Sequence, residues 1–262
     1  MLGAIAGDVI GSAFESDPVK KLDFPLFGRM TRFTDDTVLT VAIANAILRG
    51  EDYGSSLKRF GQKYPDRGYG SNFYCWMFAS VGEPYNSWGN GSAMRVSPVG
   101  FAFDSVEAVL REAERSAAVT HNHPEGIKGA QAVALAIYLA RGCKSKNEIK
   151  NEISSRFGYD LSRTLDDIRP RYCFDISCQG SVPESIIAFL ESDGVEDAIR
   201  KAVSLGGDSD TMGCIAGGIA EAYWGGVPDA IAREVRARLP EEFLEVLERF
   251  RERYPLVKPP GR

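Results

Sequence analysis

The arrangement of apolar and polar positions predicts helices along most of the chain. Apolar runs with helical spacing recur, and several end at a glycine, as residues 37–50 and 126–142 do. We expect helices within residues 37–50, 104–119, 126–142, 181–194, 195–207, 229–239 and 241–254. This pattern predicts an all-α fold.

Two of these helices carry the spacing of a capping box, in which the residue before the first turn and an acid three positions later satisfy each other's backbone N–H groups. The pairs are Asp104 with Glu107 and Ser181 with Glu184.

Segments with the two-residue period of a strand are scarce. Residues 24–33 (FPLFGRMTRF) are the best strand candidate, and a proline and a glycine weaken it.

Two segments near opposite ends of the chain have glycine on one helical face. Gly3, Gly7 and Gly11 recur every four residues, and Gly213 and Gly217 repeat the pattern. Small residues allow two helix backbones to approach closely. If these two helices pack near each other, the acidic residues that follow the first and begin the second come together.

Composition and charge restrict the class of protein. The sequence has 262 residues, 44% of them apolar, and we expect a single domain over residues 1–262. The net charge of −5 and the lack of a long basic run do not suggest an extended nucleic-acid-binding surface. No stretch reaches the ~18 apolar residues that suggest a membrane-spanning helix.

The cysteine and histidine content indicates the cell compartment of the protein and the kinds of metal site that can be expected. The five cysteines are an odd number and form no CxxC pair, which favours reduced thiols in a cytoplasmic protein. With only two histidines, a histidine-rich zinc site is not expected.

Two short acidic motifs lie far apart in the sequence, each directly before an apolar helix. FTDDT covers residues 33–37 and GGDSDTMG covers residues 206–213. Either motif alone is explained as a helix cap, because Asp and Thr are preferred there and the helix dipole favours negative charge. One cap needs one side chain, however, and together the motifs supply four carboxylates and two hydroxyls. These belong to Asp35, Asp36, Asp208, Asp210, Thr34 and Thr211.

An all-oxygen set of this kind suits a hard cation such as Mg²⁺ or Mn²⁺. Four carboxylates balance the charge of two dications, and a two-metal site can activate water and hold an oxygen-rich substrate. Residues 208–212 (DSDTM) are also similar to the DxDxT/V box of aspartate-nucleophile phosphatases. Met212 replaces the final Thr or Val of that box, and no apolar strand precedes it. We therefore favour the two-metal interpretation.

Two further segments offer polar contacts to a ligand. Residues 88–100 contain GNGSAMR, whose backbone N–H groups can form an anion-binding nest, and Arg95 can add a charge-assisted hydrogen bond to phosphate. The same residues are also an ordinary turn signal. Residues 120–126 (THNHPEG) place His121 and His123 either in a polar pocket or in a capped loop, and the loop is slightly favoured.

The order of these motifs resembles the ADP-ribosylglycohydrolase family, which includes dinitrogenase reductase-activating glycohydrolases and hydrolases of ADP-ribosyl-arginine and ADP-ribosyl-serine. The similar segments are GAIAGDVIGSAFE, FTDDT, GNGSAMR, THNHPEGIKGA and SLGGDSDTMGCIAGGIAEAYWG. The resemblance implies a compact all-α domain around a cleft with two Mg²⁺ or Mn²⁺ ions. It also implies hydrolysis of a glycosidic bond to ADP-ribose, so the expected partner is an ADP-ribosylated substrate.

The resemblance further implies roles for individual residues. The metal ligands would be Thr34, Asp35, Asp36, Asp208, Asp210 and Thr211. The catalytic groups would be Glu15, Asp36 and Asp208, with Glu15 as the candidate acid or base. The substrate contacts would be Asn90, Gly91, Ser92 and Met94, with His121 as a further candidate.

A non-catalytic binding or structural protein on the same scaffold is the alternative, since some relatives are eye-lens proteins. A site that had lost its function would be expected to lose acids, whereas all six ligand positions are filled. The leaving group stays open among arginine, serine, a nucleic-acid end and a small metabolite. The native metal and the oligomeric state also stay open.

Overall fold

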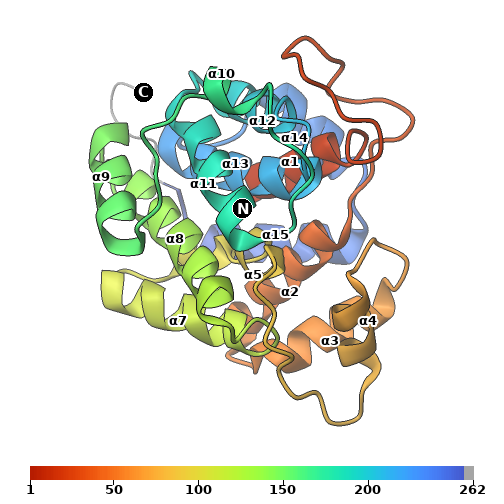
Figure 1. Ribbon diagram of the computed structural model, residues 1–262. Helices are drawn as coiled ribbons and strands as arrows, with labels where there is room; N and C mark the ends of the chain where they lie inside the picture. Colours follow the sequence, from red (N-terminus) through yellow and green to blue (C-terminus); the bar gives the residue numbers. More distant parts are fainter. Residues whose placement is uncertain (257–262) are drawn as a thin grey trace.

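The computed structural model describes residues 1–256, and in this range the chain forms fifteen helices and no strand (Figure 1). The helices are α1 (Leu2–Gly11), α2 (Asp35–Arg49), α3 (Tyr53–Lys63), α4 (Ser71–Phe78), α5 (Gly91–Met94), α6 (Ser97–Ala102), α7 (Val106–Ala118), α8 (Pro124–Arg141), α9 (Lys146–Phe157), α10 (Leu165–Ile168), α11 (Cys178–Leu190), α12 (Val195–Val203), α13 (Ser209–Trp224), α14 (Asp229–Arg236) and α15 (Glu241–Arg253). The predicted all-α fold class is confirmed.

Helix α13 lies at the centre of the molecule, and α1, α8, α11 and α12 pack around it (Figure 1). Its residues are buried without interruption from Ser209 to Ala222. Because every face of this helix is covered, its sequence is small or apolar nearly all round and has no polar outer stripe.

The glycine faces of α1 and α13 meet as expected. A methyl group at Gly213 would lie 2.7 Å from the carbonyl oxygen of Gly7. Methyl groups at Gly3 and Gly11 would overlap the backbone carbonyls of Gly217 and Ser209. The two backbones therefore touch, which brings the end of α1 beside the start of α13.

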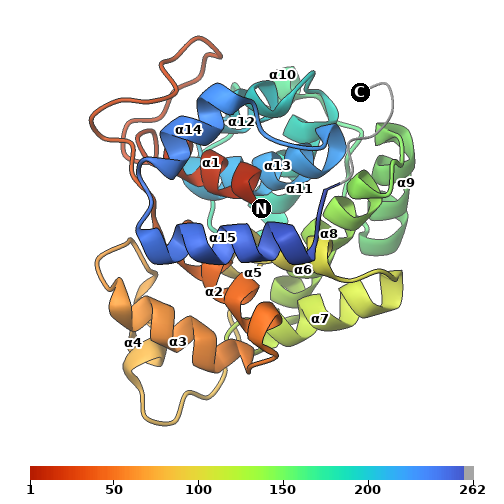
Figure 2. The same cartoon turned by 180° about the vertical axis from the view of Figure 1, so that it is seen from behind.

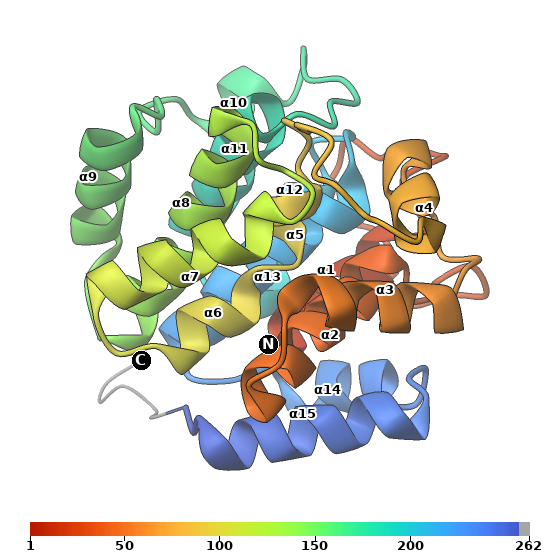
Figure 3. The ribbon, with the colours of Figure 1, turned by 90° about the horizontal axis from the view of Figure 1, so that it is seen from below.

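An outer layer of helices supports the start of α2. Figures 2 and 3 show α15 lying against α2, and Figure 2 shows α14 beside α1. Phe243 of α15 packs on Phe33, with ring centroids 5.5 Å apart, and the guanidinium of Arg67 lies 3.9 Å from the centre of the Phe33 ring. Phe33 is the first residue of the FTDDT motif at the start of α2, so these contacts hold the motif in place.

The two predicted capping boxes are wrong. The first was expected at Asp104, but Ser105 caps α7, and its hydroxyl accepts a hydrogen bond from the N–H three residues later. The second was expected at Ser181, but Ser177 caps α11, and the Ser181 hydroxyl donates to the Ser177 carbonyl within the helix. Each segment contains more than one capping side chain, and the spacing alone does not choose between them.

The predicted strand does not form. Residues 24–33 belong to the long loop between α1 and α2, part of which projects from the helical body (Figure 1). Phe24 and Phe33 of this loop are nevertheless buried. A strand needs a neighbour to pair its backbone groups, and the described chain offers none here.

Within residues 1–256, no helix combines the length and the apolar character that crossing a bilayer requires. The five cysteines form no disulfide bond.

Candidate active site

Both acidic motifs line a single cavity of about 390 Å³. Residues of the loop after α1, the loop before α5 and the turn between α7 and α8 also line the cavity. Of the site residues predicted from the sequence, those that line it are Glu15, Thr34, Asp35, Asp36, Asn90, Gly91, Met94, His121, Asp208, Asp210 and Thr211. The folded chain therefore brings together every predicted site residue except Ser92.

At the first motif, Thr34 provides the cap of α2. Its hydroxyl oxygen accepts a hydrogen bond from the N–H of Asp36. The carboxylates of Asp35 and Asp36 are not needed for this task. Asp36 accepts a hydrogen bond of 3.3 Å from the hydroxyl of Thr211 through Oδ2, and its buried Oδ1 has no partner. One buried carboxylate oxygen is thus left available for a ligand.

At the second motif, Asp208 occupies the N-cap position of α13, but its side chain makes no capping hydrogen bond. It accepts instead a hydrogen bond of 2.8 Å from the side-chain amide of Asn90. Asp210 accepts a hydrogen bond of 2.9 Å from the N–H of Thr211. Helix capping therefore does not account for Asp208, whereas Asp210 satisfies one N–H group of the first turn of α13.

Sequence reasoning missed Asp8, which lies in α1 and has no exposed surface. Its carboxylate accepts hydrogen bonds from the N–H and the hydroxyl of Thr34, at 3.0 and 2.7 Å. It also accepts from the N–H of Thr37 at 3.1 Å and from the Thr37 hydroxyl. Four donors from the first motif converge on Asp8, so Asp8 anchors that motif to α1. The signal was a lone acid in an apolar helix, which costs free energy unless it is hydrogen-bonded.

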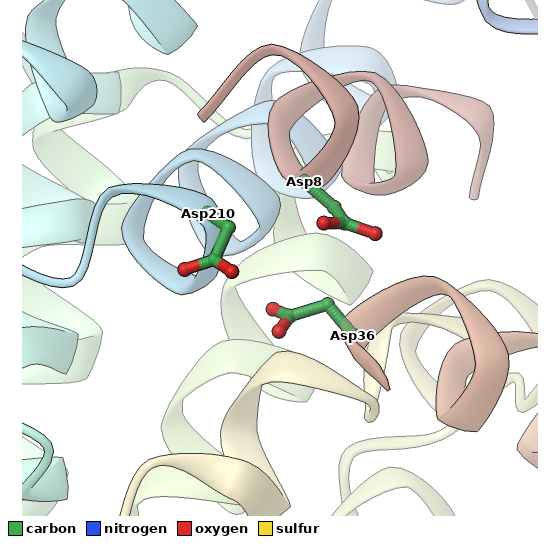
Figure 4. A group of neighbouring side chains, drawn as sticks. All are labelled: Asp8, Asp36 and Asp210. Atoms are coloured by element: carbon green, nitrogen blue, oxygen red, sulfur yellow. The ribbon is translucent and has the colours of Figure 1, made fainter. Parts of the chain in front are cut away.

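The carboxylates form two overlapping groups of three. Asp8, Asp36 and Asp210 come from α1, α2 and α13 and point toward one another in Figure 4. Glu15, Asp208 and Asp210 form the second group. In each group, one oxygen per residue lies within 4.8 Å of the others, and Asp210 belongs to both. Asp35 lines the cavity but belongs to neither group.

Burial and crowding make these carboxylates reluctant to ionise. Burial raises the pKa of Asp36 well above its usual range, and nearby carboxylates, led by Asp8, raise it further. The same two causes act on Asp210, where Asp36 is the leading neighbour. Burial raises the pKa of Asp8 to about 6, although its hydrogen bonds oppose the shift.

A hard divalent cation fits this site. The donor atoms are all oxygens, the carboxylates repel one another when ionised, and Asp36 Oδ1 is buried without a partner. The described residues therefore include an acidic cluster that can hold metal.

Glu15 reaches the same cluster from a different direction. Helix α1 ends at Gly11, so Glu15 belongs to the loop that follows, and it is an exposed residue that also lines the cavity. Burial raises the pKa of Glu15, the carboxylate of Asp208 raises it further, and Arg32 opposes the shift. A carboxyl with a raised pKa beside a ligand cavity is a candidate for proton transfer.

The loop before α5 forms another part of the cavity wall. An isolated bridge between Gly89 and Ser177 holds it against the segment before α11. Met94 is buried, and its sulfur lies 3.7 Å from the Thr211 hydroxyl. The hydroxyl of Ser92 donates to the carbonyl of Gly126 at 2.7 Å, so the structure gives Ser92 a partner within the protein. A substrate contact by Ser92 stays a prediction.

Comparison with known proteins identifies the family. The ADP-ribosylglycohydrolase family model matches residues 1–259. The chain belongs to this family. Human ADP-ribosylhydrolase ARH3 is 27% identical over an aligned length of 309 residues, gaps included. The alignment covers 86% of this chain and 84% of the human protein. ADP-ribosylarginine hydrolase Tri1 of Pseudomonas putida (strain GB-1) is 24% identical over 257 residues, which cover 86% of this chain and 69% of Tri1.

A solved structure of an ADP-ribosylglycohydrolase-related protein complex has the same fold. It superposes with a TM-score of 0.73, covers 97% of each chain and is 21% identical in sequence. Membership of the ADP-ribosylglycohydrolase family confirms the predicted enzyme class, a hydrolase of a glycosidic bond. The single domain over residues 1–262, the cytoplasmic location and the roles of individual site residues stay predictions.

Proposed function

We propose that this ADP-ribosylglycohydrolase releases ADP-ribose from a modified protein side chain, a nucleic-acid end or a small molecule, using two Mg²⁺ or Mn²⁺ ions. One observation carries the proposal: two acidic motifs far apart in the sequence line one cavity together with Glu15. The names of the relatives support it, since one is an ADP-ribosylhydrolase and another an ADP-ribosylarginine hydrolase.

The first part of the proposal concerns the cations. Their ligands would be Thr34, Asp35, Asp36, Asp208, Asp210 and Thr211. When bound, the cations would neutralise the crowded carboxylates, orient hydroxyls of the distal ribose and activate the attacking water. Hydrogen bonds already orient part of this set, because Asn90 holds Asp208 and Thr211 holds Asp36.

The second part concerns proton transfer. Glu15 would act as the acid or base, because it lies beside Asp208 and partial burial raises its pKa. The carboxylates of Asp36 and Asp208 would help to stabilise charge that develops at the anomeric carbon of the ribose. Asn90, Gly91, Met94 and His121 line the cavity and would contact the rest of ADP-ribose.

A hydrolysis panel tests the proposal. ADP-ribosyl-arginine, ADP-ribosyl-serine and an ADP-ribosylated nucleic-acid end would each be incubated with Mg²⁺, with Mn²⁺ or after treatment with EDTA. Mass spectrometry would identify the products. We expect release of ADP-ribose from at least one substrate and complete loss of turnover without cations.

Two results would contradict the proposal in different ways. Binding of ADP-ribose without turnover of any conjugate would favour a non-catalytic binding protein on the same scaffold. Turnover that survives rigorous chelation would exclude the dependence on cations.

A further inference from the structure

Arg95 carries a buried charge that no acid of the described chain neutralises. Its side chain has no exposed surface, and no carboxylate of residues 1–256 forms an ion pair with it. One nitrogen, Nη2, donates to the carbonyl of Ser116 at 3.0 Å and to the hydroxyl of Thr120 at 2.8 Å. Nε and Nη1 have no hydrogen-bond partner. Burial lowers the pKa of Arg95 to about 10, so the group is still a cation at neutral pH.

Thr120 links this cation to His121. The Thr120 hydroxyl has one hydrogen, and its oxygen already accepts a hydrogen bond from Arg95. The hydroxyl hydrogen is therefore available for Nδ1 of His121, which lies 2.7 Å away. When Nδ1 accepts this hydrogen bond, the hydrogen of the neutral imidazole is on Nε2.

The neutral state of His121 follows from the same surroundings. Burial lowers the pKa of His121 well below its usual value, and the guanidinium of Arg95 lowers it further. A second cation so close to an unpaired arginine would be costly. His121 is therefore suited to donate one hydrogen bond and is poorly suited to act as a general acid.

The Nε2 atom of His121 faces the loop before α5. A methyl group at Gly91 would lie 3.0 Å from this nitrogen, and one at Gly89 would lie 3.8 Å from it. All three residues line the cavity. Nε2 makes no hydrogen bond to the described protein, so its hydrogen is available to a ligand that enters beside Gly91.

We propose that Arg95, Thr120 and His121 form a relay that presents a fixed Nε2–H donor and a buried positive charge to an anionic oxygen of the ligand beside Gly91. This inference rests on the proposed function, in which the anion is the diphosphate of ADP-ribose. His121 binds the ligand, whereas Arg95 and Thr120 are positioning residues. Tyr85 is a competing partner for the Thr120 hydroxyl. Its ring centroid lies 5.9 Å from that of His121. Burial raises the pKa of Tyr85, and Arg95 and a hydrogen bond with Thr120 oppose this shift.

The first measurement is the position of the imidazole hydrogen. The chain has two histidines, so ¹⁵N NMR of the intact protein gives two ring systems, and His123→Gln assigns them. We expect His121 to be neutral at neutral pH with its hydrogen on Nε2. In Thr120→Val the preference for Nε2 should weaken, while Thr120→Ser and Tyr85→Phe should keep it. A hydrogen on Nδ1 of the parent protein would overturn the proposal.

The second measurement is the affinity for free ADP-ribose with Mg²⁺ present, by calorimetry. We expect Thr120→Val to weaken binding about tenfold, as loss of an oriented hydrogen bond to a charged group does. Thr120→Ser keeps the hydroxyl and should stay within about twofold of the parent. KM should rise in Thr120→Val with little change in kcat. Equal affinities of the Val and Ser variants would overturn the relay.

These measurements separate the relay from the proposed function. The position of the imidazole hydrogen on His121 is measured without any substrate, so this result remains valid even if no conjugate is hydrolysed. Failure of hydrolysis with intact ADP-ribose binding contradicts only the proposed activity. A correct hydrogen position with no binding of ADP-ribose by the parent would contradict the assignment of diphosphate as the ligand of the relay.

Discussion

The cavity has two parts whose buried charges are not compensated by the protein. One part contains crowded carboxylates, and the other contains a buried arginine. Around α13, carboxylates from three helices crowd together, and their pKa values are raised because burial and mutual repulsion disfavour ionisation. Around His121, a buried arginine lacks any ion-pair partner in the described chain. Charges in a low-dielectric interior are costly without compensation. Each part is therefore incomplete by itself, and a ligand with cations at one part and a diphosphate at the other would complete both.

The two parts also differ in how their side chains are held. Two of the helices that carry the acidic residues, α1 and α13, meet through direct backbone contact, as Gly7 and Gly213 show, and hydrogen bonds to Asp8 join α2 to α1. The His121 part is held by a chain of single hydrogen bonds through Thr120. Changes to the acidic part should therefore alter catalysis and stability, and changes to the His121 part should alter ligand affinity.

The largest expected effect is at Glu15. We predict that Glu15→Gln lowers turnover ~10²-fold or more, the scale of a lost general acid or base, while ADP-ribose still binds. Asp17→Asn is the matched control, because Asp17 is an exposed acid on the same loop. Steady-state kinetics and calorimetry would measure both variants. Near-normal turnover in Glu15→Gln would remove this residue from the mechanism.

Asp208→Asn separates a cation ligand from a helix cap. Asn caps helices about as well as Asp, and Asp208 makes no capping hydrogen bond. We predict that the cation-free variant melts at or above the temperature of the cation-free parent, because one repelling charge is removed. A bound cation at a hundredfold excess over its Kd stabilises a protein by about 2.7 kcal/mol, and this gain should shrink sharply in the variant. Equal cation-induced shifts in melting temperature would argue that Asp208 is not a ligand.

Asp8→Asn should change stability in the opposite direction. The amide nitrogen of Asn cannot accept hydrogen bonds, so some of the four donors from Thr34 and Thr37 lose their acceptor. Hydrogen bonds to charged groups contribute about 1.5–3 kcal/mol each, so we predict a lower melting temperature without cations. Comparison with Asp208→Asn under the same conditions is the control. An unchanged or higher melting temperature would mean that Asp8 does not anchor the motif.

The smallest expected effect is at Gly91. Its φ angle does not require glycine, but a methyl group would lie 3.0 Å from Nε2 of His121. We predict that Gly91→Ala weakens ADP-ribose binding several-fold and leaves the cation-induced shift in melting temperature unchanged. Gly28→Ala is the control, since a methyl group there meets nothing within 4 Å. Unchanged ADP-ribose affinity would mean that Gly91 is part of an ordinary turn.

The sequence by itself determined the all-α class, the glycine faces of α1 and α13 and the two acidic motifs. These features are local, because each depends on spacing within a few residues of one segment. The sequence did not determine which of several nearby side chains caps a helix, as Ser105 and Ser177 show.

Only the tertiary structure decided how these segments meet. The hydrogen bonds from Thr34 and Thr37 to Asp8 join α1 to α2, and the sequence alone did not reveal them. The unpaired charge of Arg95 likewise depends on which groups surround it after folding. Burial and through-space neighbours set charge and hydrogen bonding, and the sequence encodes them only through packing over long separations in the chain.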